Sequence, residues 1–210
     1  MRKKKIKKII LTVLILLVVI ILINKFSVKK QEEIKRLYSL YEDLNASQTY
    51  LFEMEQSDNN KTIMGKKEDK TIIDQYSKGN RLTTIVKDNN TYLVLHDKEE
   101  YYIYEQNNVE QTILTDGMKE IVQNSFTTGT EKVKGKKYSY EEYTGSTIFM
   151  ISSTLDSNEN EIKTRFYFDK DNNLAYIRTI NGPKQELLKI NIKKEVDDSI
   201  FEIPSNYAEN

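Results

Sequence analysis

The sequence contains no cysteine and no tryptophan, a single histidine, and only seven glycines and two prolines in 210 residues. Without cysteine, the chain can form no disulfide framework, no thiolate metal site, no cysteine nucleophile and no lipidated cysteine of the lipoprotein type. A Ser-His-Asp triad would have to use His96, and no serine motif accompanies it. We therefore expect a non-enzymatic protein, with His96 an exposed or half-buried strand residue beside a turn at Asp97 and Lys98.

The formal charge of zero conceals two regions of opposite character. Residues 1 to 30 carry nine lysines and arginines and no acid, which leaves 23 bases against 32 acids, a net charge of −9, for residues 31 to 210. A protein that binds DNA or RNA must neutralise phosphates, so the acidic region argues against nucleic acid as a partner. At about 180 residues, this region is long enough for one domain with its own core.

An apolar run of fifteen residues from Ile9 to Ile23 contains one residue that is not apolar, Thr12, and the span extends to eighteen residues if Ile6 is counted past Lys7 and Lys8. As a helix, eighteen residues are about 27 Å long, close to the hydrocarbon thickness of a bilayer. A cleavable secretory signal would end in a small-residue site, and residues 24–28 contain none. The sequence therefore favours an uncleaved membrane anchor over a cleaved signal peptide.

The flanks of this run predict its orientation. Six bases in the first eight residues outnumber the three that follow the run, and the more basic flank stays in the cytoplasm. We expect a single-pass protein of the cell membrane with a cytoplasmic basic stub (1–8), a transmembrane signal-anchor helix (9–25), a juxtamembrane amphipathic helix (26–46) and an extracytoplasmic β-rich domain (47–210). The membrane is thus its first expected partner.

Two segments of the extracytoplasmic part show helical periodicity. Steps of three and four residues place one apolar stripe on the juxtamembrane helix, formed by Ile34, Leu37, Tyr38, Tyr41 and Leu44. A second helical stretch covers residues 109–122, with a break expected near Asp116 and Gly117.

Short β-rich runs separated by polar turns make up the rest. The triplet Asp-Asn-Asn occurs at 58–60, 88–90 and 171–173, and both residue types tolerate the positive φ of tight hairpins. The expected strands span residues 49–56, 61–67, 81–87, 91–97, 100–106, 124–133, 136–145, 146–154, 161–169, 174–180 and 185–194. The sequence thus predicts an α+β fold: an N-terminal transmembrane helix, then a large antiparallel β-sheet with a few helices covering it.

Three other patterns resemble chemical sites and have simpler explanations. Asp169, Asp171 and Asn173 match the D-x-D-x-N pattern at the beginning of a calcium-binding loop. The glycine and the glutamate that such a loop requires at later positions are missing, so we expect a hairpin turn and no metal. The segment 129–136 (GTEKVKGK) nearly matches a phosphate-binding loop, and we interpret its glycines as turn residues. The carboxylates of Glu141 and Glu142 point to opposite faces of a strand, and we place them at a solvated sheet edge.

The closing segment reads V-D-D-S-x-F-x-I-P-x-x-Y, with Asp198, Phe201, Pro204 and Tyr207 as its distinctive residues. Together with the preceding hairpin at 166–180, it resembles the end of proteins of the outer-membrane lipoprotein carrier (LolA-like) superfamily. The resemblance implies an incomplete β-barrel closed by helices, whose concave apolar face can hold acyl chains. A composition rich in Lys, Asn, Ile and Tyr is typical of an AT-rich Gram-positive genome, so we expect a membrane-anchored Gram-positive member.

We therefore predict that the domain binds a lipid, a lipopeptide or lipoprotein, or an apolar segment on the concave face of its sheet, without a cofactor. Alternation places Tyr50, Phe52 and Met54 on one side of their strand, and Phe166 and Phe168 on one side of theirs. The expected groove residues are Tyr50, Phe52, Met54, Tyr92, Val94, Phe166, Phe168 and Tyr176. The alternative is an interaction module that docks another envelope protein, a regulator or an assembly factor, and has a sheet face filled by its own side chains.

Overall fold

The computed structural model describes residues 35–57, 60–105, 114–145 and 162–210. By its internal contacts the chain divides into Met1–Lys35 and Arg36–Asn210, and the description below concerns the second unit. The expected anchor, the start of the juxtamembrane helix and the expected strand at 146–154 lie outside the described residues. Within the described ranges, no helix has the length and hydropathy needed to cross a membrane.

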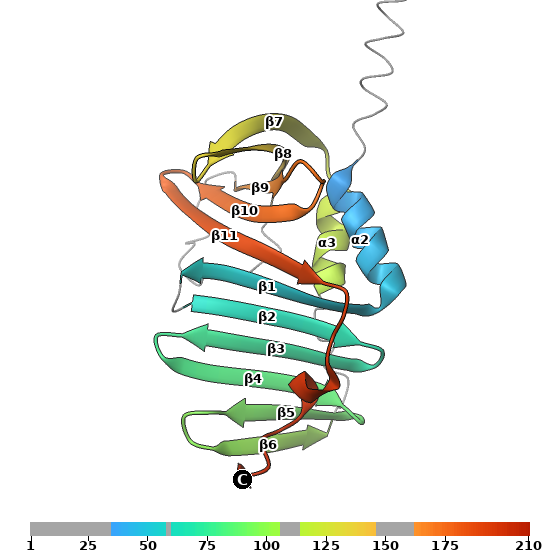
Figure 1. Ribbon diagram of the computed structural model, residues 1–210, viewed down its shortest axis with the longest axis vertical. Coiled ribbons are helices and arrows are strands. Elements are labelled where there is room, and N and C mark those ends of the chain that lie inside the picture. The colour runs from blue at the N-terminus through green and yellow to red at the C-terminus, as the bar shows by residue number, and fades with distance from the viewer. Residues whose placement is uncertain (1–34, 58–59, 106–113, 146–161) are drawn as a thin grey trace, which may run out of the picture. The chain divides into compact units, whose positions relative to one another are not determined.

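The described residues form one open twelve-stranded sheet and two α-helices, which confirms the expected α+β class (Figure 1). From edge to edge the strand order is β12-β6-β5-β4-β3-β2-β1-β11-β10-β9-β8-β7. The bounds of the strands are β1 (Thr49–Ser57), β2 (Asn60–Lys67), β3 (Lys70–Ser77), β4 (Asn80–Lys87), β5 (Asn90–Leu95), β6 (Glu100–Glu105), β7 (Phe126–Val133), β8 (Lys136–Thr144), β9 (Lys163–Phe168), β10 (Leu174–Asn181), β11 (Lys184–Lys193) and β12 (Ala208–Glu209).

The sheet is not antiparallel throughout, although the sequence predicts that it should be. Strand β12 pairs in parallel with β6, and every other pair of neighbours is antiparallel. Two described strands are absent from the sequence prediction, β3 and β12. Strand β3 is hard to recognise because its buried positions include the carboxylate of Asp74, and β12 is only two residues long.

Two of the three Asp-Asn-Asn triplets lie in hairpin turns, as expected, and residues 58 and 59 of the other triplet lie outside the described residues. Asp88 and Asn89 connect β4 to β5 with φ of 51° and 60°, and Asn172 has φ of 62° between β9 and β10. In the triplet at 58–60, Asn60 pairs with Ser57. Such left-handed conformations are tolerated by Asn and Asp because their short side chains bond locally.

Both helices pack on one side of the sheet. Helix α2 (Arg36–Ser47) buries Leu37 and Leu44 completely, whereas Tyr38 is exposed and donates its hydroxyl hydrogen to Glu42, so Tyr38 does not belong to the apolar stripe. Leu40 takes its place beside Tyr41.

Helix α3 (Leu114–Val122) continues through Asp116 and Gly117, so the expected break is wrong. A mid-helix glycine costs only about 1 kcal/mol, and burial of Met118, Ile121 and Val122 outweighs that cost.

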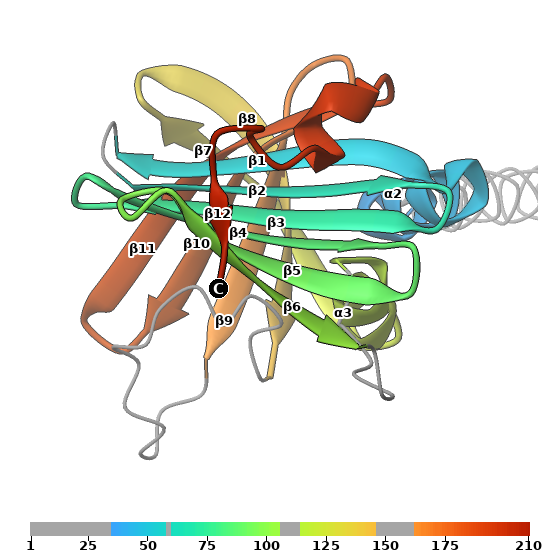
Figure 2. The ribbon, with the colours of Figure 1, turned by 90° about the horizontal axis from the view of Figure 1, so that it is seen from below.

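Two apolar clusters lie on opposite faces of the sheet. The larger one, on the helix side, joins α2 and α3 to residues of β1 and β8–β11. The smaller one lies on the other side, where residues 196–210, here called the C-terminal strap, pack on β3–β6. Figure 2 shows β9–β11 at a steep angle to β1–β6, so the sheet curls toward the side on which α3 lies.

Candidate functional site

The cross-strand register shows which side chains share a face. Phe52 is opposite Met64, and the same row continues through Ile73, Thr84 and Leu93 to Tyr102 on β6. Directly opposed residues project from the same side of a sheet. Since Phe52 belongs to the cluster under the helices, this whole row lies on the helix side.

Five of the eight expected groove residues lie in the closed part of that side. Tyr50, Phe52, Met54, Phe166 and Phe168 are each at most 1% exposed and belong to the larger cluster. Burial raises the pKa of Tyr50 to about 12, so its hydroxyl stays neutral. These residues lie together as expected, and they fill the interior beneath α2 and α3.

Tyr92 and Val94 lie on the opposite face. Tyr92 pairs with Ile85, Val94 pairs with Thr83, and both belong to the cluster under the strap. They therefore cannot line one groove together with Phe52. Strand β5 reads Asn-Thr-Tyr-Leu-Val-Leu, which has apolar residues on both faces, so alternation does not reveal its inner side.

Tyr176 is also separated from Phe166 and Phe168. A register shift between Leu174 and Tyr176 moves Tyr176 to the face of Tyr167, while Leu174 and Ile177 stay on the helix side. There its ring meets Tyr138 edge-to-face, with centroids 5.3 Å apart. Ligand binding by any of the eight residues stays a prediction.

Beyond the closed core, the helix side of β3–β6 carries a second set of apolar residues. One row contains Ile73, Leu93 and Tyr102, and the adjacent row contains Leu82 and Leu95. All five are half-buried, and none belongs to either apolar cluster. We call these five residues the open apolar rows; the sequence prediction missed them because it assigned the wrong face of β5.

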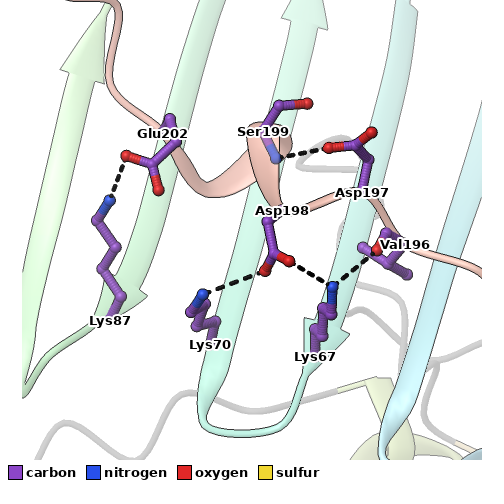
Figure 3. A network of polar contacts seen from close by, with 8 residues as sticks. All are labelled: Lys67, Lys70, Lys87, Val196, Asp197, Asp198, Ser199 and Glu202. Carbon is purple, nitrogen blue, oxygen red and sulfur yellow. Dashed lines mark hydrogen bonds and ion pairs between the residues drawn. The ribbon is translucent and has the colours of Figure 1, made fainter.

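The other face of the same strands is covered by the C-terminal strap. Figure 3 shows its ionic contacts: Asp198 accepts hydrogen bonds from Lys67 at 2.6 Å and Lys70 at 3.2 Å, and Glu202 pairs with Lys87 at 3.0 Å. The bonds from Lys67 and Lys70 lower the pKa of Asp198 below its usual value. Asp197 caps the short 3-10 helix η1 (Asp198–Phe201) by accepting from the backbone N–H of Ser199.

Apolar contacts reinforce these ion pairs. Phe201 is completely buried, and Ile200 lies over Gly65 of β2. A Cβ at Gly65 would lie 2.8 Å from a methyl group of Ile72, so only glycine fits this position without a shift. Pro204 accepts a bond from the backbone N–H of Tyr207. All four distinctive residues of the closing motif therefore belong to the strap.

A partly buried network of hydrogen-bonded side chains connects the strap to β3–β5. The buried carboxylate of Asp74 accepts from both Arg81 and the hydroxyl of Thr83, which is 2.7 Å away. Thr83 Oγ1 also lies 2.8 Å from His96 Nε2, and His96 Nδ1 lies 3.0 Å from the Tyr207 hydroxyl. Because Thr83 donates its only hydroxyl hydrogen to Asp74, His96 must donate from Nε2 and accept at Nδ1.

The environment of His96 favours this neutral form. Desolvation by burial is the main cause that lowers the pKa of His96, and the nearby Arg81 guanidinium lowers it further. His96 is half-buried, as expected, but it lies in the turn after β5 and not in the strand, which ends at Leu95. Within the described ranges, no group of three or more His, Asp or Glu could hold a metal ion.

Glu141 differs sharply from its expected place at a solvated edge. It is completely buried on the helix side and accepts from the backbone N–H groups of Arg36 at 2.7 Å and Leu37 at 3.2 Å. The hydroxyl of Tyr143 also donates to it. A carboxylate at a helix N-terminus satisfies otherwise unpaired N–H groups and the helix dipole, so Glu141 fixes the beginning of α2 to β8.

No family model and no curated protein matches the chain. Among solved structures, an uncharacterized conserved protein from Thermus thermophilus is similar with a TM-score of 0.46 and 9% identity, covering 87% of this chain and 98% of that one. The lipoprotein LppX of Mycobacterium tuberculosis is similar with a TM-score of 0.43 and 10% identity, covering 79% and 99%. Similarities this weak carry no conclusion about function.

Proposed function

We propose that this chain is a non-enzymatic, membrane-anchored envelope protein whose domain binds an apolar ligand, a lipid acyl chain or the lipid part of a lipopeptide, on the helix side of β3–β6. Residues 9–25 hold the domain at the outer surface of the cell membrane. Ligand binding shields apolar groups from water and involves no covalent chemistry.

The open apolar rows are the observation that carries this proposal. Ile73, Leu93 and Tyr102 continue the row of the buried Phe52 toward the sheet edge, but they remain half-buried. Contiguous apolar surface outside a packed core is typical of a binding site, because leaving it in water costs free energy. On the opposite face of these strands, the strap covers the apolar cluster and is bound there by Asp198, Phe201 and Glu202.

A photoactivatable phospholipid in membranes that contain the full chain tests this function. After irradiation, peptide mass spectrometry maps the labelled residues, and we expect labels on β3–β6 as well as in the anchor. A Leu93→Glu variant should lose the labels on β3–β6 because a carboxylate in the rows opposes an acyl chain. The matched control is Ile103→Glu, on the strap side of β6, where the side chain is exposed. Labels confined to the anchor in the native chain, with the domain folded, would rule out lipid binding.

A second candidate is a module that docks another envelope protein. It is favoured by the complete burial of Tyr50, Phe52 and Phe166, since the interior beneath the helices is filled by the chain's own side chains. In the labelling experiment this candidate predicts an unlabelled domain. Crosslinking in intact cells should then recover one defined protein partner, and Leu93→Glu should abolish that product.

A further inference from the structure

The hairpin between β7 and β8 carries an unusual concentration of positive charge. Lys132, Lys134, Lys136 and Lys137 fall within six residues and are all exposed. None of them forms an ion pair with a carboxylate of the described residues. These four lysines, here called the basic tip, lie in a region whose overall charge is negative.

The pairing within the basic tip costs stability. Lys132 lies directly opposite Lys137 in the β7–β8 ladder, and like charges at opposed positions repel one another. The nearest acid on β7, Glu131, is already paired with Arg165 at 2.9 Å and with Arg178. Gly135, with φ of 82°, forms the turn, whereas Gly129 lies inside β7 against Tyr140 and is no turn residue.

The acids of the neighbouring β9–β10 turn do not neutralise the tip. Asp169 accepts bonds within its own turn from Asp171 N and from Asn173. Asp171 lies 3.9 Å from Lys170, a lysine whose side chain is 90% exposed and adds to the positive charge. Beside the turn, Lys134 lies over the ring of Tyr176, which packs on Tyr138. Tyrosines of this kind are common at membrane interfaces.

The first helix of the domain begins next to β8, the strand that starts in the basic tip. Arg36 binds Glu141 through its backbone N–H and bonds to Ser139, so the beginning of α2 is fixed to β8, which begins at Lys136. In Figure 1, α2 begins beside the β7–β8 edge of the sheet. Ten residues separate the expected end of the anchor at 25 from Arg36, and ten residues extend at most about 35 Å. An anchor that ends at residue 25, as proposed above, would thus allow the basic tip to reach the membrane surface.

We propose that the basic tip binds the headgroups of anionic phospholipids and thereby orients the domain on the membrane. Lysine ammonium groups attract phosphate over about one Debye length, and each contributes roughly fivefold to association with an anionic surface. The short tether makes such weak contacts effective because it holds the local lipid concentration high. This inference rests on the anchor that is part of the proposed function.

The cysteine-free sequence allows one fluorescent label per chain. Full-length protein with Thr130→Cys beside the tip, or with Ser77→Cys in β3 as a reference, is inserted into vesicles whose headgroups carry a quencher. The vesicles contain phosphatidylcholine alone or with one third phosphatidylglycerol. We expect stronger quenching at position 130, but not at position 77, in the anionic vesicles, and its loss in about 1 M salt, where the Debye length is about 3 Å.

A triple variant separates the tip from general charge. K134Q/K136Q/K137Q should weaken the phosphatidylglycerol-dependent contact on the order of a hundredfold, because three lysines are removed. The matched control K78Q/K98Q/K119Q has the same net charge, removes exposed lysines elsewhere and should behave like the native chain.

Two results would overturn the proposal. Equal quenching in neutral and anionic vesicles, with the protein floating with both, would disprove the basic tip and leave the anchor intact. Protein that floats with neither kind of vesicle would disprove the anchor and the tip together.

Discussion

The hydroxyl of Tyr207 lies 3.0 Å from Nδ1 of His96, which joins the C-terminal strap to the single histidine of the chain. The two rings also meet edge-to-face, with centroids 5.5 Å apart. Because His96 Nε2 donates to Thr83, its Nδ1 is left as an acceptor for the tyrosine hydroxyl. The last residues of the strap are thus bound to His96, whose protonation state decides whether Nδ1 can accept this hydrogen bond.

Removal of this one hydroxyl should loosen the end of the strap. Tyr207→Phe keeps the ring contact and leaves His96 Nδ1 without its partner, which should cost about 1 kcal/mol of unfolding free energy. For a chain of this size, that corresponds to roughly 2–4 °C in the melting temperature. Amide hydrogen exchange should rise in residues 203–210 and stay unchanged in β8–β10. Unchanged exchange at the strap would show that the hydrogen bond does not hold it.

The stability of the domain should fall below about pH 6.5. Desolvation and Arg81 depress the pKa of folded His96, against the opposing effects of Asp74 and Asp97. The unfolded state therefore binds the proton first, and stability is lost as pH falls from the unfolded value near 6.5 through the lower folded value. Melting curves between pH 7.5 and 5 should show this loss, and His96→Gln should lack it. A native chain with the same pH profile as His96→Gln would contradict this assignment.

Sequence reasoning succeeded where a local rule applies. The two described Asp-Asn-Asn turns and the alternation of Tyr50, Phe52 and Met54 depend on neighbouring residues only, and both were predicted correctly. The inner face of β5 depends on its register with β4 and on the strap, which arrives from more than a hundred residues away. Nothing in the alternation of Tyr92 and Val94 carries that information.

Glu141 illustrates the same limit for a charged residue. Next to Glu142 it resembles a solvated pair, and only the arrival of the α2 N-terminus explains its burial. The open apolar rows also escape prediction, because apolar residues on both faces of β4 and β5 predict burial on either side.

The buried side chain of Phe201 should contribute far more to the binding of the strap than the strap's ion pairs do. Phe201→Ala leaves a cavity in a fully buried position and should cost about 3–5 kcal/mol, roughly 10 °C in the melting temperature. Asp198→Asn removes the contacts with Lys67 and Lys70 at the solvent-exposed surface and should change the melting temperature little. Thermal unfolding followed by circular dichroism compares the two variants directly. A larger effect of Asp198→Asn would mean that the ionic contacts hold the strap.

The buried carboxylate of Glu141 should be essential for the attachment of α2. In Glu141→Gln an amide N–H₂ group replaces one acceptor oxygen and faces the N–H groups of Arg36 and Leu37, and the negative charge at the helix N-terminus is lost. We expect a loss of about 2–3 kcal/mol in unfolding free energy, since hydrogen bonds to charged groups are the stronger ones. The exposed Glu120 of α3 provides the matched control, and Glu120→Gln should change stability by less than about 0.5 kcal/mol. Chemical unfolding of the two variants at pH 7, with hydrogen exchange in residues 36–47 as the local measure, distinguishes the outcomes. Equal stability of both variants would show that α2 is held by Leu37 and Leu44 alone, and that Glu141 is buried without stabilising the helix.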